Sequence, residues 1–368
     1  MKKSTENRVT IAVFILIIFG FFAAMAIIPD ERYSLSERRK LAEFPDFTLK
    51  SVFSGKAMEE LSDYTADHFP MREEFRALKA AFTYKVYFQK DNNGIYIEDG
   101  QVSKLDFPLN PDSVKSFISK INRVYDMYFA DSGQNAYFAL IPDKNYYITD
   151  ENGYPDMDYK KMFSMLREGL DGEISKIDLS QYLGAEDYYR TDIHWRCEKL
   201  GPAAQALCEE MGLGGADIGD ERVEELDRDF YGVYYGQSAL PLEPDKIRYI
   251  TNEDILSSYV KDIDRGKEGG IYWGEGDEHD RYTFFLNGSS SLLTIENPNA
   301  DSEKKLVIFR DSFASALAPW LVEAYGEITM VDIRYIAPEA LLQFADFSGC
   351  DVLFIYSSGV VNHSETLK

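Results

Sequence analysis

The run Leu306–Phe313 (LVIFRDSF) joins four consecutive apolar residues to a short polar turn. A short continuous apolar run is typical of a strand that is buried on both faces of a parallel sheet. The run therefore predicts a buried strand at 306–309 that ends just before Ser312. Active sites of open α/β sheets lie at the carboxyl ends of their strands, so Ser312 is placed where chemistry is expected.

Segments on both sides of this strand alternate between helical and extended patterns. Helical spacing of apolar residues predicts helices at 51–90, 112–128, 159–173, 198–211, 313–325 and 338–347. Short apolar runs predict strands at 95–97, 136–141, 328–331 and 352–356. This alternation predicts an α/β fold with a mostly parallel sheet and helices on both faces. Short Tyr-rich, Gly-punctuated segments between 227 and 297 predict a β-rich insertion.

The N-terminal segment Val9–Ile28 is an uncharged apolar run of about 20 residues, long enough to cross a bilayer as a helix. An uncleaved membrane anchor is the favoured interpretation. A secretory signal is the alternative, because Lys2 and Lys3 form a basic start and Ala24–Ala26 resembles a cleavage site. Long C-terminal domains are translocated largely regardless of their charge, so the rest of the chain is expected outside the cytoplasm.

These patterns predict three parts. Residues 1–30 form the membrane anchor or signal peptide, residues 31–90 a stalk with a juxtamembrane helical segment, and residues 91–368 the main domain. With 39 basic and 63 acidic side chains the formal net charge is −24, which argues against nucleic acid and against docking on anionic lipid through bulk charge. The three cysteines form no disulfide framework or metal-ligand spacing, and Cys197 and Cys208 are predicted on one helix. We expect no metal and no cofactor.

A second segment, Thr191–Trp195 (TDIHW), places Asp192 and His194 two residues apart. In a Ser-His-Asp triad the His takes the proton of the Ser hydroxyl, and the Asp orients and stabilises the imidazolium. Asp192, His194 and Ser312 therefore supply the three residue types, provided that the two segments meet in space. The backbone N–H groups of the helix after Ser312 are expected to hold an oxyanion. The alternatives are that Ser312 only caps that helix, and that His194 is structural or binds metal with Asp192.

The segment Tyr188–Trp195 (YYRTDIHW) resembles the signature of the DHHW family, with Ile193 where the family name has a second His. Further segments that resemble the family pattern are Asp67–Arg72, Ile141–Lys144, Phe309–Phe313 and Val331–Tyr335. The family is similar to the alginate O-acetylation proteins and to the wider SGNH hydrolase superfamily. The resemblance implies an SGNH-like three-layer sandwich, circularly permuted so that the Ser follows the Asp/His pair.

Carried over residue by residue, the resemblance implies that Ser312 is the nucleophile, His194 the base and Asp192 its orienting partner. The function implied is an extracytoplasmic O-acyltransferase that acetylates a cell-envelope polysaccharide or exopolysaccharide through a Ser acyl-enzyme. A polysaccharide is then the substrate, and a polytopic membrane O-acyltransferase is the implied partner. Two alternatives remain open: a carbohydrate acetylesterase with the same triad, and a catalytically silent envelope scaffold or glycan-binding protein.

The same resemblance implies a substrate pocket near the triad. Arg334, Tyr335 and Lys144 are the residues expected to bind substrate there. A structural ion pair is the alternative role for each of them. His68, in the segment Asp67–Arg72, is expected to cap and pack the juxtamembrane helix.

Overall fold

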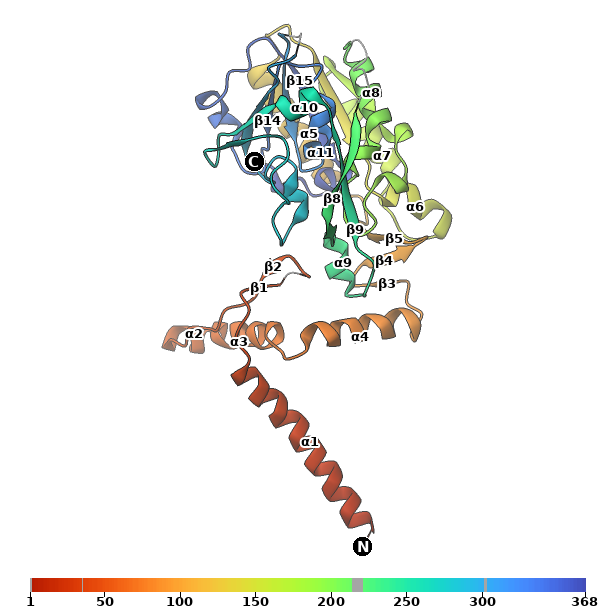
Figure 1. The fold of residues 1–368 in the computed structure, drawn as a ribbon, viewed down its shortest axis with the longest axis vertical. Helices are drawn as coiled ribbons and strands as arrows, with labels where there is room; N and C mark the ends of the chain where they lie inside the picture. The colour runs from red at the N-terminus through yellow and green to blue at the C-terminus, as the bar shows by residue number, and fades with distance from the viewer. Residues whose placement is uncertain (1, 35, 214–220, 301–302) are drawn as a thin grey trace. The chain divides into compact units, whose positions relative to one another are not determined.

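The computed structural model describes residues 2–34, 36–213, 221–300 and 303–368 of the chain (Figure 1). The chain divides into two compact units. The first unit comprises residues 1–93 and 235–242, and the second comprises residues 94–234 and 243–368. The division into an anchor, a stalk and a main domain stays a prediction.

The second unit is built around an eight-stranded sheet in the order β11-β10-β12-β14-β13-β15-β6-β7. Strands β14, β13, β15, β6 and β7 are parallel, and β12, β10 and β11 extend one edge in antiparallel pairing. The bounds are β6 Ala136–Ile141, β7 Ile174–Asp178, β10 Tyr259–Asp262, β11 Lys267–Gly269, β12 Leu292–Glu296, β13 Lys305–Arg310, β14 Glu327–Val331 and β15 Cys350–Ser357. The predicted mixed α/β fold with a mostly parallel sheet is confirmed.

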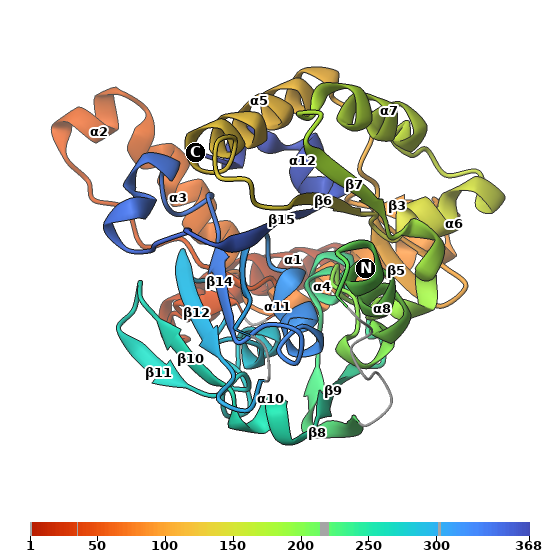
Figure 2. The same ribbon diagram turned by 90° about the horizontal axis from the view of Figure 1, so that it is seen from above.

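Helices lie on both faces of this sheet (Figure 2). Helices α5, α7 and α12 cover one face, and α8 and α11 lie on the other. The helix bounds are α5 Pro111–Tyr128, α6 Asn145–Asn152, α7 Tyr159–Gly169, α8 Gly201–Glu210, α10 Glu253–Ser257, α11 Ala314–Leu317 and α12 Ser358–Asn362. A small hairpin joins β4 (Ile95–Glu98) to β5 (Gln101–Lys104), and β8 (Arg222–Phe230) pairs with β9 (Asp245–Thr251) in a separate two-stranded sheet.

Strand β13 shows why the apolar runs are continuous. Successive side chains of a strand point to opposite faces of its sheet. Val307 and Phe309 belong to the core beneath α5 and α7, whereas Leu306 and Ile308 belong to the core beneath α8 and α11. Each strand that serves two cores must be apolar at every position, so the period-2 pattern of a half-exposed strand is absent here.

Two expected helices differ from the structure. The helix predicted at 313–325 is only α11, followed by a 3₁₀ turn at Ala318–Trp320, because Pro319 has no N–H with which to continue the helical hydrogen bonds. The segment predicted as a helix at 338–347 is a 3₁₀ helix, Pro338–Gln343. Cys197 and Cys208 are not on one helix, since Cys197 begins a separate 3₁₀ turn before α8, and both thiols are free and buried.

The predicted β-rich segment at 227–297 contributes to two sheets. Strands β10, β11 and β12 join the main sheet, whereas β9 pairs with β8 outside it. Local sequence could indicate the β character of this segment but not its sheet partners, because pairing depends on residues far apart in the chain. Its status as an insertion stays a prediction.

The first unit contains the apolar N-terminal helix. Helix α1 (Lys2–Ile27) includes a 21-residue stretch, Asn7–Ile27, which is long and apolar enough to cross a membrane. The predicted helical segment at 51–90 consists of three helices: α2 Leu49–Phe53, α3 Lys56–Asp67 and α4 Arg72–Lys85. The remaining elements are β1 Tyr33–Ser34, β2 Arg39–Lys40, β3 Asp91–Asn92 and α9 Val233–Ser238, which begins in the second unit.

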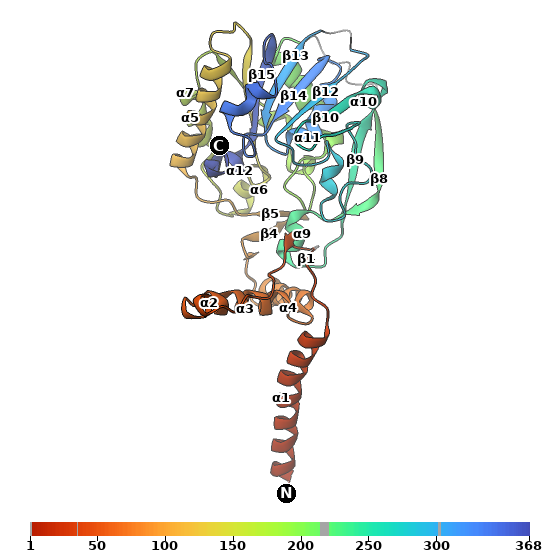
Figure 3. The same ribbon diagram turned by 90° about the vertical axis from the view of Figure 1, so that its left-hand side faces the viewer.

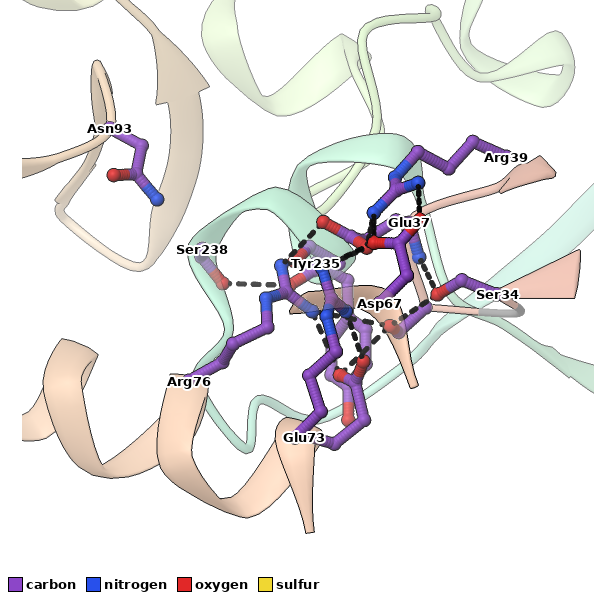
Figure 4. A network of polar contacts seen from close by, with 12 residues as sticks. Ser34, Glu37, Arg39, Asp67, Glu73, Arg76, Asn93, Tyr235 and Ser238 are labelled. Carbon is purple, nitrogen blue, oxygen red and sulfur yellow. Dashed lines mark hydrogen bonds and ion pairs between the residues drawn. The ribbon is translucent and has the colours of Figure 1, made fainter. Parts of the chain in front are cut away.

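A polar network holds the first unit together around Asp67 (Figure 4). The Asp67 carboxylate accepts hydrogen bonds from both terminal nitrogens of Arg39, one of them at 2.8 Å, and from the N–H of Ala42 at 2.9 Å. The Arg39 guanidinium lowers the pKa of Asp67 to about 2. His68 is the C-cap residue of α3, and its ring packs 4.5 Å from that of Tyr64, as expected for a capping and packing role.

We expect Asp67→Asn to weaken the first unit at neutral pH, because an amide cannot accept both donors of Arg39. Hydrogen bonds to charged groups contribute about 1.5–3 kcal/mol each. The folded-state pKa of Asp67 lies below the ordinary 3.8, so this contribution is present above that value and is lost as the pH falls through about 2. Hydrogen exchange of the α3 amides should therefore be faster in the variant at neutral pH and similar in strong acid.

The exposed Asp63 of the same helix offers a matched control. Asp63→Asn should leave the exchange of α3 unchanged at both pH values. Equal exchange rates for Asp67→Asn and the wild type at neutral pH would contradict the role assigned to Asp67.

Candidate active site

The turn that follows β13 is fixed by the buried carboxylate of Asp311. One oxygen of this carboxylate accepts the N–H of Phe313 at 3.0 Å, and the other accepts the N–H of Ser357 at the end of β15 at 2.8 Å. These bonds tie the turn to the neighbouring parallel strand. They leave Ser312, which lies between the two anchored residues, partly exposed at the carboxyl edge of the sheet.

A second loop, formed by residues 188–195, lies beside the turn that contains Ser312. Tyr188 and Trp195 form an isolated antiparallel bridge, and the N–H of Tyr189 donates to the carbonyl of His194 at 3.0 Å. The indole N–H of Trp195 donates to the carbonyl of Phe313 at 2.8 Å, and the two rings meet edge to face. This contact joins the loop to the residue directly after Ser312.

The three predicted triad residues are brought together in the structure. Nδ1 of His194 lies 2.6 Å from Oδ1 of Asp192, and Nε2 of His194 lies 2.8 Å from Oγ of Ser312. Asp192 is fully buried and His194 is 8% exposed. This arrangement allows the imidazole to take the Ser312 proton while the buried carboxylate stabilises the resulting imidazolium.

Asp192 has partners beyond the imidazole. Its Oδ1 accepts the backbone N–H of His194 at 3.1 Å, and its Oδ2 accepts the N–H of Val233 at 2.8 Å. The backbone of Gly232 passes so close that a Cβ there would lie 2.2 Å from the carbonyl oxygen of Thr191. Gly232 is thus required because no side chain fits between the two chain segments.

Two charged side chains fix the backbone just before Asp192. Nζ of Lys144 donates to the carbonyls of Val102, Tyr189 and Arg190, the last two at 2.9 and 3.1 Å. The carboxylate of Asp245 accepts the N–H groups of Arg190 at 2.9 Å and of Thr191 at 2.8 Å, together with the Thr191 hydroxyl. One cation on the carbonyl groups and one anion on the N–H groups therefore hold the same short segment.

Lys144 is almost fully buried, in contrast with the open position that a substrate-binding side chain would occupy. Burial lowers its pKa to about 7, and the nearby carboxylates of Asp192 and Asp245 raise it. Nζ also lies 5.1 Å from the centroid of the Tyr234 ring. The geometry of Lys144 is that of a positioning residue, and the substrate-binding role stays a prediction.

Arg334 and Tyr335 follow β14, whose carboxyl end lies beside that of β13. The Arg334 guanidinium pairs with the buried carboxylate of Asp332 at 2.6 Å and lies over the Tyr335 ring at 5.4 Å. The ion pair that was the alternative for Arg334 is therefore present. Tyr335 is about half exposed. Substrate binding by either residue stays a prediction.

A tyrosine that the sequence did not single out covers the imidazole. The Tyr282 ring stacks on His194 with 3.8 Å between centroids and 9° between planes, and its hydroxyl donates to the carbonyl of Ser312 at 3.4 Å. Burial raises the pKa of Tyr282, which keeps its hydroxyl a neutral donor. A cation over an aromatic face is attracted by about 0.5–2 kcal/mol, so this ring favours the imidazolium.

Beneath the nucleophile lies the buried guanidinium of Arg310. Its Nη1 donates to the carbonyl of Asp311 at 3.3 Å and to the hydroxyl of Ser315 at 3.2 Å. Burial lowers the pKa of Arg310, while the carboxylate of Asp332 raises it. Helix α11 has only four residues, so the oxyanion role expected for a helix N-terminus stays a prediction. Among the described residues, no group of three or more His, Cys, Asp or Glu side chains could hold a metal ion.

Sequence reasoning missed the residues that orient the triad from a distance. Tyr282 and Gly232 both fall in the Tyr- and Gly-rich segments, whose composition indicated only irregular β structure. Asp245 lies 54 residues from Thr191 and follows no motif. The Gly between aromatic residues at 231–236 was a usable signal, because an isolated Gly in such a run can mark a close backbone approach.

The fold and the site together define an α/β protein with a Ser-His-Asp constellation at the carboxyl edge of its sheet, an arrangement that recurs on unrelated folds. No protein-family model and no curated protein sequence matches the chain. Among solved structures, the fold resembles a DHHW family protein from Eubacterium siraeum, with a TM-score of 0.62 and 20% identity over 75% of this chain and 94% of that chain.

Bacillus cereus PatB1, solved with a sulfonyl adduct, has a TM-score of 0.59 and 19% identity over 73% of this chain and 95% of its own. The O-acetyltransferase domain of Pseudomonas putida AlgJ has a TM-score of 0.45 and 13% identity over 73% of this chain and 92% of its own. The DHHW structure and PatB1 thus confirm the resemblance in fold that was expected from the sequence.

We expect Gly232→Ala to destabilise the second unit, because the new methyl group would overlap the Thr191 carbonyl and push Asp192 away from its donors. Overpacking of this kind costs about 1–3 kcal/mol. Thermal unfolding measures the loss. Gly270→Ala is the matched control, since a Cβ at Gly270 meets nothing within 4 Å and should leave the melting temperature unchanged. Equal melting temperatures for the two variants would rule out the close approach.

Proposed function

We propose that this protein is an extracytoplasmic O-acyltransferase that acetylates a cell-envelope polysaccharide or exopolysaccharide through an acyl-enzyme on Ser312. The observation that carries the proposal is the unbroken hydrogen-bonded chain from Asp192 through His194 to Ser312. Partial exposure of Ser312 beside a nearly buried imidazole supports the same assignment, because a nucleophile must meet its substrate while its base is kept from water.

The proposed reaction has two halves. His194 Nε2 takes the Ser312 hydroxyl proton as Oγ attacks the acyl carbon of a donor ester, and the tetrahedral oxyanion then expels the donor alcohol, which receives that proton. In the second half His194 deprotonates a sugar hydroxyl, whose oxygen attacks the Ser312 ester. The acyl group passes to the sugar, and Oγ recovers the proton from the imidazolium.

The proposed roles of the surrounding residues follow from their contacts. Asp192 holds the imidazole in one orientation and stabilises its charged form, and the Tyr282 ring adds to that stabilisation. Arg334 and Tyr335 are proposed to bind the sugar at the same sheet edge, since a guanidinium and a half-exposed aromatic ring suit hydroxyl-rich ligands.

The finer points of location and fold belong to the same proposal. Helix α1 is proposed as a single membrane span, with the second unit outside the cytoplasm and a polytopic membrane acyltransferase supplying the acyl donor. The fold is proposed to be a circularly permuted SGNH-like sandwich, with Ser312 after the Asp192/His194 pair. The length and apolar composition of α1 support the span, and the resemblance to the DHHW structure supports the fold.

The test of the proposal is covalent labelling of the full chain in detergent. Bacillus cereus PatB1 has been solved with a sulfonyl adduct, and sulfonyl fluorides modify activated serines, so phenylmethanesulfonyl fluoride is the first probe and p-nitrophenyl acetate the second. We expect intact-mass and peptide analysis to find one sulfonyl or acetyl group on Ser312, and none in Ser312→Ala. A folded wild-type protein without an adduct would favour the scaffold or glycan-binding alternative.

The molecule that accepts the acetyl group from Ser312 distinguishes a transferase from an esterase. With acetyl-labelled enzyme, we expect oligosaccharides to gain acetyl groups and to accelerate loss of the adduct, because a bound sugar hydroxyl outcompetes water. Loss of the adduct at the same rate with and without sugars, with acetate as the only product, would identify a carbohydrate esterase instead.

We expect Lys144→Met to slow the labelling of Ser312 by up to about 100-fold, because a displacement of roughly 1 Å in a reacting group has that effect. The wild type and the variant should have similar far-ultraviolet circular dichroism. Lys120→Met is the matched control, since Nζ of Lys120 also donates to two backbone carbonyls, those of Ser364 and Leu367, away from the triad. Equal labelling rates in both variants would exclude a positioning role for Lys144.

A further inference from the structure

Helix α4 carries a stripe of apolar side chains that are about half exposed. Phe75, Leu78, Phe82 and the adjoining Val86 repeat at intervals of three and four residues, so they lie on one side of the helix. Each of these side chains is between 44% and 53% exposed. A surface helix of a water-soluble domain normally turns such a stripe toward the core.

The opposite side of α4 makes the contacts to the rest of the first unit (Figure 4). Ala80 and Thr83 are buried there. Arg76 donates to the Gly236 carbonyl at 2.7 Å and pairs with Glu73 and Glu37 at 2.8 and 3.3 Å. The polar side of α4 is therefore satisfied by protein. On its apolar side, Phe75 packs against Phe21 and Phe69 and remains about half exposed.

The surface around this stripe is also apolar. Residues 44–88 contain more exposed large apolar side chains than the whole described part of the second unit. In addition to the α4 stripe they are Phe44, Phe47, Leu49, Val52, Phe53, Met58, Phe69, Met71, Tyr87 and Phe88. Figures 1 and 3 both show α2, α3 and α4 in one layer with α1 leaving it on one side. So many exposed large apolar side chains in one segment indicate an interaction site rather than ordinary solvent-facing surface.

Contacts with α1 place the stripe at a defined distance from the C-terminal end of the apolar helix. The Phe21 ring lies 5.0 Å from Phe69 and 5.9 Å from Phe75. Phe21 is six residues before the end of α1 at Ile27, which corresponds to about 9 Å along a helix axis. Amphipathic helices that lie in a membrane surface bury their apolar face about 5–10 Å into the boundary between headgroups and acyl chains.

A cavity of about 980 Å³ lies between α1 and the two long helices of the layer. Ile17, Phe22 and Met25 line it from α1, and Thr65 and Phe69 line it from α3 and the adjoining residues. The wall from α1 is apolar, whereas Arg72, Lys79 and Asn92 are among the polar residues that line the opposite wall. Acyl chains can lie along the apolar wall, with headgroups toward the polar one.

We propose that the segment with α2, α3 and α4 lies at the membrane surface. The exposed faces of these helices lie in the lipid interface of one leaflet, the one that contains the C-terminal end of α1. The occupant of the apolar surface is the bilayer itself, and the segment forms an interfacial collar around the anchor. This inference rests on the proposed span α1 and extends it.

Charge complementarity supports the lipid as occupant. The chain as a whole has a formal net charge of −24, so bulk charge repels it from anionic headgroups. Helix α4 is an exception, with four basic residues against two acidic ones in its 14 residues, whereas α3 has one basic residue against four acidic ones. Arg72 and Arg76 pair with Glu37 and Glu73, and the Lys79 ammonium donates to Oδ1 of Asn93 at 3.0 Å. The exposed Lys85, at the end of α4, is the residue placed to extend an ammonium group to the headgroups.

The test uses the full chain in vesicles of phosphatidylcholine and phosphatidylglycerol. An environment-sensitive fluorophore is attached to Leu78→Cys or Phe82→Cys, and nitroxide quenchers are placed on the lipid acyl chains near the headgroup or near the chain end. The three native cysteines are buried, and labelling of the wild type gives the background. Leu256→Cys and Leu342→Cys, at exposed leucines of the second unit, are the matched controls.

We expect emission from positions 78 and 82 to shift to shorter wavelength and to be quenched most by the nitroxide near the headgroup, with neither effect at 256 or 342. Water-like emission at 78 and 82, equal to the controls, would overturn the collar. So would shifted emission without lipid quenching, which would indicate a second copy or another protein surface. A probe at Phe14→Cys, within α1, must be quenched most by the deep nitroxide, and its failure would overturn the anchor itself.

Discussion

Burial of one carboxylate, that of Asp192, constrains the whole candidate site. A charged group without access to water is costly unless hydrogen bonds and opposite charge replace its hydration. Asp192 is compensated by the backbone and ring of His194 and by the N–H of Val233. These partners come from two chain segments about 40 residues apart, so both must be held in register before the carboxylate can be buried.

Contacts around Asp192 hold these two segments in place. Lys144 and Asp245 bind the carbonyl and N–H groups just before Asp192, and Trp195 ties the end of the same loop to the turn after β13. None of these side chains touches the reacting oxygen of Ser312. Their contribution is geometric, since a triad transfers a proton only when donor and acceptor lie within hydrogen-bond reach. A few residues that lie away from Ser312 therefore fix the positions of the triad residues through long-range contacts.

The two units differ in where they place their apolar and polar side chains. The second unit buries apolar strand residues on both faces of its sheet and leaves polar groups at the carboxyl edge, where Ser312 becomes accessible. The first unit places a partly buried polar network around Asp67 and Arg76 and leaves many of its aromatic residues exposed. Exposure of so many aromatic side chains is favourable in apolar surroundings, which is the physical reason for proposing that the layer of α2, α3 and α4 lies at a membrane surface.

The sequence alone was sufficient for features that depend on neighbouring residues. The apolar runs at 136–141 and 306–309 indicated strands buried on both faces, the span at Val9–Ile28 indicated an apolar helix, and Asp192, His194 and Ser312 were recognisable by residue type and local position. Local signals failed where helices end for tertiary reasons. The segment after Ser312 has helical spacing, but Pro319 and close packing limit it to a short helix and a 3₁₀ turn.

Only the tertiary structure decided which groups meet. The stacking of Tyr282 on His194, the clamp of Lys144 and Asp245, and the entry of β10–β12 into the main sheet all join residues separated by tens of positions. Likewise, helical spacing predicted a helical segment at 51–90, but only the fold shows that Phe75, Leu78 and Phe82 of α4 are about half exposed. Periodicity records which side chains share a face, whereas the partner of that face depends on packing between distant parts of the chain.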